Sequence, residues 1–241
     1  MMVCPYDDKH LLLILQIDHS KVTGWFAAHW GNDNFARPAP YAAMVLAAQE
    51  HDTGWWDWEI KPQLNADGLP PDYIGSIKHL GGKVWLDFYR HGIERLAEQD
   101  PYAGYIVSLH SDGLMTQGRG LLPYMPDYTI YPEVKAFLDE QESYRAELMK
   151  QLQSLDEYRD WVSQEQLWKN FIFIERLKWF TYLGIAGHMH YWRSPAHKEI
   201  DLVEEREGGL FGYELRWTGA RVASSSKAWL SAYPGAEYNL V

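Results

Sequence analysis

Apolar residues recur every third or fourth position over much of the first 160 residues. This spacing is typical of amphipathic helices, and Gly, Pro and Asn-rich breaks separate one periodic segment from the next. We expect helices over 18–30, 41–52, 84–99, 102–114 and 133–153. In the first helix, Val22, Trp25, Phe26 and His29 share an apolar face, which predicts that this face is buried.

Other segments of this part of the chain lack the helical spacing. The apolar run at 11–17 (LLLILQI) is shorter than the ~18 residues of a membrane span and predicts a buried strand. Two long segments rich in Gly, Pro and aromatic residues, 55–82 and 116–132, predict loops.

The pattern changes near the C-terminus. A helix is expected over 164–184, followed by alternating segments at 191–203 and 210–217 that predict two strands. The sequence Glu-Glu-Arg-Glu-Gly-Gly between them indicates a hairpin turn. A short helix at 228–230 and an extended end at 237–241 complete the prediction. The fold class is therefore α+β, with a mostly helical domain over 1–160 and a small mixed tail over 161–241.

Composition narrows the functional classes. The chain has 33 acidic and 22 basic residues, which give a net charge of −11. This acidic balance argues against a protein that binds nucleic acid mainly through its phosphates. Cys4 is the single cysteine, so a disulfide framework is excluded. The first residues lack a basic region followed by a cleavage site, and we expect a cytoplasmic protein without a membrane segment.

Three histidines lie on the apolar faces of three predicted helices: His29, His51 and His110. Asp52 follows His51 directly. Imidazole and carboxylate are ligands for Mn, Fe, Zn or Ni, and a bound metal ion of this kind activates water and orients a phosphate. The pattern predicts a divalent metal site, in which Asp52 also has a catalytic role.

A structural role is the alternative for each of these residues. A histidine on an apolar helix face is often a core residue that is hydrogen-bonded to the backbone. Trp55 and Trp56 either line a substrate pocket or pack a long loop onto the helices. Asp112 is either a further ligand or a carboxylate at a helix end.

Three strings carry a family resemblance: AHWGN from position 28, EHDTGWWDW from position 50 and DPYAGYIVSLH from position 100. Over about residues 1–160 the chain resembles an uncharacterised bacterial family whose His and His-Asp signatures are similar to those of HD-type phosphohydrolases. The resemblance implies that His29, His51, Asp52 and His110 share one pocket. Family members carry a late Asp-Arg-Leu, and here Glu175-Arg176-Leu177 implies Glu175 as the last ligand.

The predicted hairpin of the tail carries a second motif. Asp201 on one strand and Glu214 with Arg216 on the next resemble the PD-(D/E)XK nuclease arrangement, with Arg in place of Lys. The strings QLWKNFI, HYWRS and KAWLSAYPGA make residues 164–241 similar to the nuclease-like C-terminal domain of a family of AAA-type ATPases. This resemblance implies a partial PD-(D/E)XK-like tail and a fusion of two family pieces near residue 160.

These observations give one main hypothesis and two alternatives. The main hypothesis is an HD-like metal-dependent phosphohydrolase that acts on a small-molecule substrate. The alternatives are a non-catalytic module that binds a small molecule or a metal, and a degenerate nuclease-like domain. A tail of this size exposes apolar strand faces, so we expect it to dock on the helices or on a second copy in a homo-oligomer.

Overall fold

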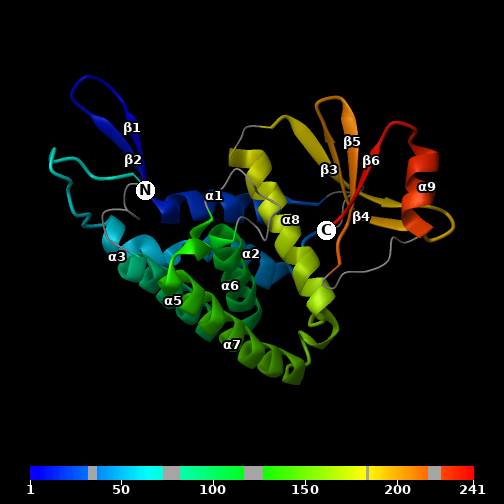
Figure 1. Cartoon of the computed structure of the whole chain (residues 1–241), viewed down its shortest axis with the longest axis horizontal. Helices are drawn as coiled ribbons and strands as arrows, with labels where there is room; N and C mark the ends of the chain where they lie inside the picture. The colour runs from blue at the N-terminus through cyan, green and yellow to red at the C-terminus, as the bar shows by residue number, and fades with distance from the viewer. Residues whose placement is uncertain (32–36, 73–81, 117–126, 183–184, 217–223) are drawn as a thin grey trace. The chain divides into compact units, whose positions relative to one another are not determined.

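A computed structural model describes residues 1–31, 37–72, 82–116, 127–182, 185–216 and 224–241. It confirms the α+β class, since a mostly helical part precedes a mixed four-stranded sheet (Figure 1). The chain forms two compact units: the first comprises Met1–His29 and Pro40–Arg159, and the second comprises Trp30–Ala39 and Asp160–Val241. In the described residues, no helix has both the length and the apolar character required to cross a membrane.

The first unit contains a hairpin and a set of packed helices. Its elements are β1 (Met2–Pro5), β2 (Leu11–Ile14), α1 (Gln16–His29), α2 (Tyr41–Glu50), η1 (Thr53–Trp55), α3 (Trp56–Glu59), α5 (Gly82–Gln99), α6 (Pro101–Met115), η2 (Tyr128–Ile130) and α7 (Pro132–Ser154). A short turn, η3 (Arg159–Trp161), begins at the last residue of the first unit and continues into the second unit. The expected helices over 41–52, 84–99, 102–114 and 133–153 are confirmed.

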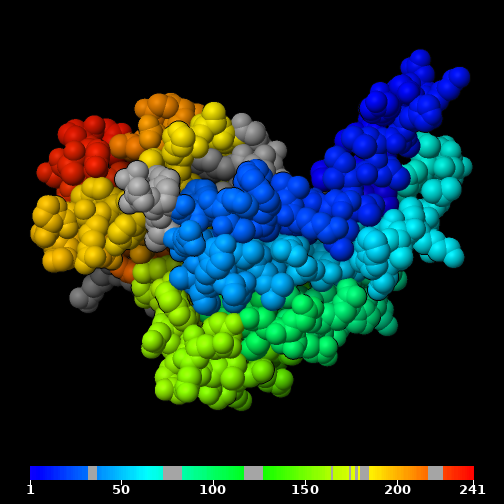
Figure 2. All heavy atoms as spheres, turned by 180° about the vertical axis from the view of Figure 1, so that it is seen from behind, coloured from blue at the N-terminus to red at the C-terminus, as the bar shows by residue number. Residues whose placement is uncertain are grey.

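The expected strand at 11–17 is confirmed in part, but its expected burial is wrong. Only Leu11–Ile14 is extended, and it pairs antiparallel with β1, which the sequence analysis missed. Leu11, Leu12 and Leu13 are 39–49% exposed, because this two-stranded sheet stands out from the helices instead of lying among them (Figure 2). The chain then turns directly into α1.

The expected buried face of α1 is also wrong. Val22, Trp25 and Phe26 are exposed, whereas the buried residues are Gln16, Ser20, Thr23, Gly24 and Ala27. Small residues allow α1 to approach α2 closely: a Cβ at Gly24 would lie 2.6 Å from Cβ of Gln49. Close packing of the two backbones therefore determines which face of α1 is buried.

The second unit contains α8 (Gln164–Tyr182), β3 (Gly187–Arg193), β4 (Glu199–Arg206), β5 (Gly209–Glu214), α9 (Ser224–Ala232) and β6 (Glu237–Leu240). The strands lie in the order β3-β4-β5-β6, and β5 pairs parallel with β6. The sheet lies between α8 and α9 (Figure 1). Phe173 and Trp179 of α8 pack on Met189 and Leu202, and Trp229 of α9 packs on the other face.

The expected single strand at 191–203 is two strands. β3 and β4 pair antiparallel and are joined by a turn, in which Ser194 N donates to Lys198 O at 2.8 Å. The expected hairpin turn lies between β4 and β5, where Glu207 and Gly208 both have positive φ. Glu207 accepts the left-handed conformation in a tight turn that Gly208 completes.

The register of β3 and β4 contains a β-bulge. His190 lies opposite Val203 and Trp192 lies opposite Ile200, so two residues of β4, Asp201 and Leu202, lie opposite Tyr191 alone. A bulge changes the alternation of side chains along a strand. Ile200 and Val203 accordingly pack in the same cluster on the α9 face, although they are three positions apart, and Leu202 packs on the α8 face.

Candidate metal centre

The first unit brings two histidines and one aspartate together. His19 lies on α1, His51 caps the C-terminus of α2, and Asp52 is the next residue. One potential ligand atom from each lies within 4.8 Å of the other two, and among the described residues this is the group that can hold a metal ion. His51 and Asp52 are each 5% exposed.

The backbone near Asp52 is fixed by close packing of η1 on α5. A Cβ at Gly54 would lie 1.9 Å from the carbonyl oxygen of Phe88, so only glycine permits this approach. The Arg95 guanidinium donates to the carbonyl oxygen of Thr53 at 3.0 Å. These contacts hold the turn after α2 and thereby position the carboxylate.

The hydrogen bonds of His51 determine which ring nitrogen can bind a metal. Nδ1 lies 2.9 Å from the carbonyl oxygen of Ala48. A carbonyl only accepts, so Nδ1 carries the hydrogen and Nε2 of the neutral ring carries a lone pair. His51 Nε2 is buried without a hydrogen-bond partner among the described residues and lies 3.3 Å from Asp52 Oδ2.

The spacing of the atoms fits a common metal ion. His19 Nε2 lies 4.0 Å from Asp52 Oδ2, on which His51 Nε2 also converges. Two tetrahedral zinc ligands with bonds of about 2.1 Å lie about 3.4 Å apart. Gln16 Nε2 donates to the same carboxylate oxygen at 3.4 Å and orients it from α1.

The histidines also determine the charge state of the carboxylate. Burial by itself would raise the pKa of Asp52, but when the neighbouring imidazoles are protonated, the charge and hydrogen bond of His51, followed by the charges of His110 and His19, outweigh burial and lower that pKa well below its ordinary value. The carboxylate is therefore ionised, as a metal ligand must be.

The residues expected at this site divide into three groups. His51, Asp52 and His110 are buried together, and the His110 ring lies edge-on to His51 with a centroid distance of 5.1 Å. His29 lies elsewhere: it is exposed at the end of α1, and its ring stacks on Trp25 at 4.3 Å. Glu175 lies on α8 of the second unit.

The two tryptophans have different positions. Trp55 is 1% exposed and packs with Trp58, Phe88 and Tyr89, whereas Trp56 is 40% exposed. Asp112 is an ion-pair partner, with Oδ2 at 3.0 Å from Arg145 NH2. His19 was not predicted as a ligand from the sequence, and it lies beside the stripe of small and polar residues that α1 buries.

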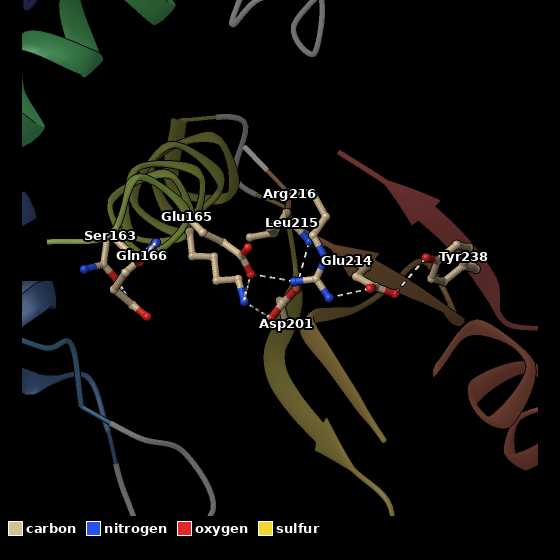
Figure 3. A network of polar contacts seen from close by, with 10 residues as sticks. Ser163, Glu165, Gln166, Asp201, Glu214, Leu215, Arg216 and Tyr238 are labelled. Atoms are coloured by element: carbon tan, nitrogen blue, oxygen red, sulfur yellow. Dashed lines mark hydrogen bonds and ion pairs between the residues drawn. The ribbon is translucent and has the colours of Figure 1, made fainter. Parts of the chain in front are cut away.

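The second unit brings the residues of the tail motif into one polar network. Arg216 NH2 donates to Glu214 Oε1 at 2.6 Å, and Arg216 NH1 lies 4.0 Å from Asp201 Oδ2. Figure 3 shows this guanidinium between acidic groups from three elements. The third acid is Glu165 of α8, at 2.7 Å from Arg216 NH1, which the sequence analysis missed together with Lys169.

No curated protein and no solved structure matches this chain. One family matches residues 1–225 and is described as a protein of unknown function, DUF3891. The match extends without a break past residue 160, and neither the expected HD-like family nor the nuclease-like domain of AAA-type ATPases is found. The expected resemblance to a family of unknown function is thus confirmed over a longer range, and the chain belongs to the DUF3891 family.

Proposed function

We propose that this protein is a metal-dependent hydrolase whose first unit binds one divalent transition-metal ion through His19, His51 and Asp52. The observation that carries the proposal is the orientation of His51. Its Nδ1–H donates a hydrogen bond to the carbonyl oxygen of Ala48, and its buried Nε2 lies 3.3 Å from Asp52 Oδ2. Two lone-pair atoms at this separation repel each other unless a proton or a cation lies between them.

The composition of the ligand set favours catalysis over a purely structural site. Structural zinc sites use four protein ligands, whereas catalytic sites use three and leave a position for water. Two imidazoles and one carboxylate suit Zn, Mn, Fe or Ni. A metal ion held by His19, His51 and Asp52 would supply Lewis-acid chemistry that activates water at neutral pH.

A small phosphoester is the substrate class that we propose. The metal ion would bind a phosphoryl oxygen and supply the attacking hydroxide, so the two reacting groups would meet at one centre. His110 lies next to His51 within the same buried cluster and is the residue we assign to the leaving-group side, as a proton donor or hydrogen-bond donor.

The experiment combines metal analysis with an activity assay. The full chain is purified without chelator, and bound metal is measured by mass spectrometry for wild type, His19→Ala and His51→Ala. His29→Ala is the matched control, because this histidine belongs to the same helix as His19 and is exposed. We expect near-stoichiometric metal in wild type and in the control. In both ligand variants, the metal affinity should fall by more than the ~10–100-fold that an outer-shell change causes.

The activity assay then uses p-nitrophenyl phosphate and bis-p-nitrophenyl phosphate with Mn²⁺, Zn²⁺ or Ni²⁺. Turnover that depends on His51 supports the hydrolase. Bound metal without turnover of either ester would replace it with the non-catalytic metal-binding module. If wild type binds no metal, the proposal is wrong and the histidines are core residues. Circular dichroism of each variant separates loss of metal from loss of fold.

A further inference from the structure

The second unit contains a cavity of about 360 Å³ between α8, the strands β3 and β4, and the segment at 37–39. This volume lies at the lower end of the range of small-molecule sites, about 300–1,000 Å³. Four aromatic side chains line it: Trp30, Trp161, Phe173 and Tyr191. Aromatic walls favour a flat ring, which can stack on them or pack against their edges.

One face of α8 supplies three of the polar groups that line the cavity, and Arg37, His190 and Asp201 supply others. Gln166, Lys169, Asn170 and Phe173 line it at the spacing i, i+3, i+4 and i+7, which places them on the same side of the helix. Asn170 is already engaged, since its Nδ2 donates to Ala39 O at 2.9 Å and its Oδ1 accepts from Gln166. Asn170 therefore fixes Gln166 and the 37–39 segment.

Gln166 retains hydrogen-bonding capacity after these contacts. Its Nε2 donates to Asn170 Oδ1 at 3.2 Å, which uses one of two amide hydrogens. Its Oε1 accepts no hydrogen bond from the residues that the structure describes. The amide thus offers an acceptor and a donor side by side, the pair that a glutamine uses to bind the edge of adenine.

The β-bulge between β3 and β4 places Asp201 in the wall of the cavity that faces α8. It aims Asp201 at α8, where Oδ1 lies 2.9 Å from Lys169 Nζ, while Oδ2 accepts from Leu215 N at 2.8 Å. Lys169 also contacts Glu165 Oε1 at 3.1 Å. Arg216 shares these two carboxylates and also pairs with Glu214, so three acids balance two cations in this network. Among the described residues, Lys169 Nζ contacts these two carboxylates, which leaves one of its three N–H donors for a ligand.

The charges of Lys169 and its partners bear on the class of ligand, beside Arg37, which also lines the cavity. An anion would be attracted by an uncompensated cation, but Lys169 lies between two acids and is held in its charged form: burial by itself would lower its pKa, and Asp201 with Glu165 raises it. A neutral heterocycle that accepts a hydrogen bond from Lys169 fits better than a free phosphate.

We propose that the second unit binds a purine-type heterocycle, a nucleobase or nucleoside, in this cavity. The ring packs against the aromatic walls, and its edge is hydrogen-bonded to the Gln166 amide and to the Lys169 ammonium. The site is separate from the metal ligands, all of which belong to the first unit.

The test is isothermal titration calorimetry on the full chain with adenosine, guanosine, AMP and ribose 5-phosphate as probes. We expect binding of at least one nucleoside and no binding of ribose 5-phosphate. Gln166→Met keeps the side-chain length and removes both hydrogen bonds, so it should weaken the nucleoside about tenfold or more. Gln151→Met, on an exposed position of α7, is the matched control and should bind as wild type does.

Trp161→Leu gives a second test of the same cavity that does not depend on the folding of the first variant. It removes one aromatic wall and should also weaken nucleoside binding. The proposal is overturned if no nucleoside binds at millimolar concentration, if Gln166→Met and Trp161→Leu bind as tightly as wild type, or if ribose 5-phosphate binds and adenosine does not. Treatment with EDTA should leave nucleoside binding unchanged, which separates this site from the metal centre.

Discussion

A buried ion pair between α6 and α7 offers the sharpest test of how the first unit is held together. Arg145 NH2 lies 3.0 Å from Asp112 Oδ2, and the two side chains are only 7% and 5% exposed. The same guanidinium donates to Ser108 Oγ at 3.0 Å, and Ser108 donates to Gln141 Oε1 at 3.0 Å. The network explains why a charged residue can lie on the buried side of α7.

The substitution Arg145→Met removes the cation and keeps much of its aliphatic volume. Asp112 would then be buried without this counter-charge, and removal of one partner of a buried pair costs about 3–5 kcal/mol. That is a large fraction of the ~5–15 kcal/mol by which a domain is usually stable. Replacement of both partners, as Arg145→Met with Asp112→Leu, should recover most of the loss, since apolar groups then fill the same space.

Urea unfolding followed by circular dichroism at 222 nm measures both effects. Arg159→Met is the matched control, because Arg159 pairs with Asp156 at the surface, with side chains 63% and 89% exposed. Such a pair contributes about 0–1 kcal/mol. A loss below about 1 kcal/mol in Arg145→Met, or a double variant as unstable as the single one, would refute the assignment of a buried and coupled pair.

Two further predictions concern packing and pH. Gly54→Ala should lower the free energy of unfolding by about 1–3 kcal/mol or more, because its Cβ would meet Phe88 O at 1.9 Å; an unchanged melting temperature would contradict this. Hydrogen bonds from Arg90 lower the pKa of Glu140 below its ordinary 4.5, so the pair stabilises the fold above that pH and the effect is lost as pH falls through the lowered pKa. Because both groups are partly exposed, Glu140→Gln should cost only about 0.2–1 kcal/mol at pH 7, and the melting temperatures of variant and wild type should converge as the pH falls through the lowered pKa.

Long periodic segments could be predicted from the sequence, whereas changes of direction within the sheet could not. The helices α2, α5, α6 and α7 lie where their spacing predicts them. The turn that separates β3 from β4 was missed, because Ser-Pro-Ala-His-Lys at 194–198 interrupts an otherwise continuous alternation only briefly. The β-bulge depends on pairing between strands, and a single strand's sequence carries no signal for it.

The sequence motif of the tail predicted only part of its polar cluster. Asp201, Glu214 and Arg216 were expected to meet at the hairpin, and they do lie in one network. The motif gave no indication of the helix that completes this network. Glu165 and Lys169 are 36 and 32 residues from Asp201 in sequence, and only the packing of α8 on the sheet brings them to it.

His29 was expected at the site, and His19 lies there instead, because another stripe of α1 is buried. Large apolar side chains usually mark the buried face of a helix, and they indicated the stripe that ends at His29. In α1 the buried stripe consists of small residues, because α2 lies too close for large ones, as the 2.6 Å separation at Gly24 shows. A helix that meets its neighbour through glycine, serine and alanine brings its backbone close enough for a short ligand such as Asp52 to reach a histidine on the neighbouring helix. The close packing that buries the small residues of α1 is therefore the packing that brings the candidate metal ligands His19, His51 and Asp52 together.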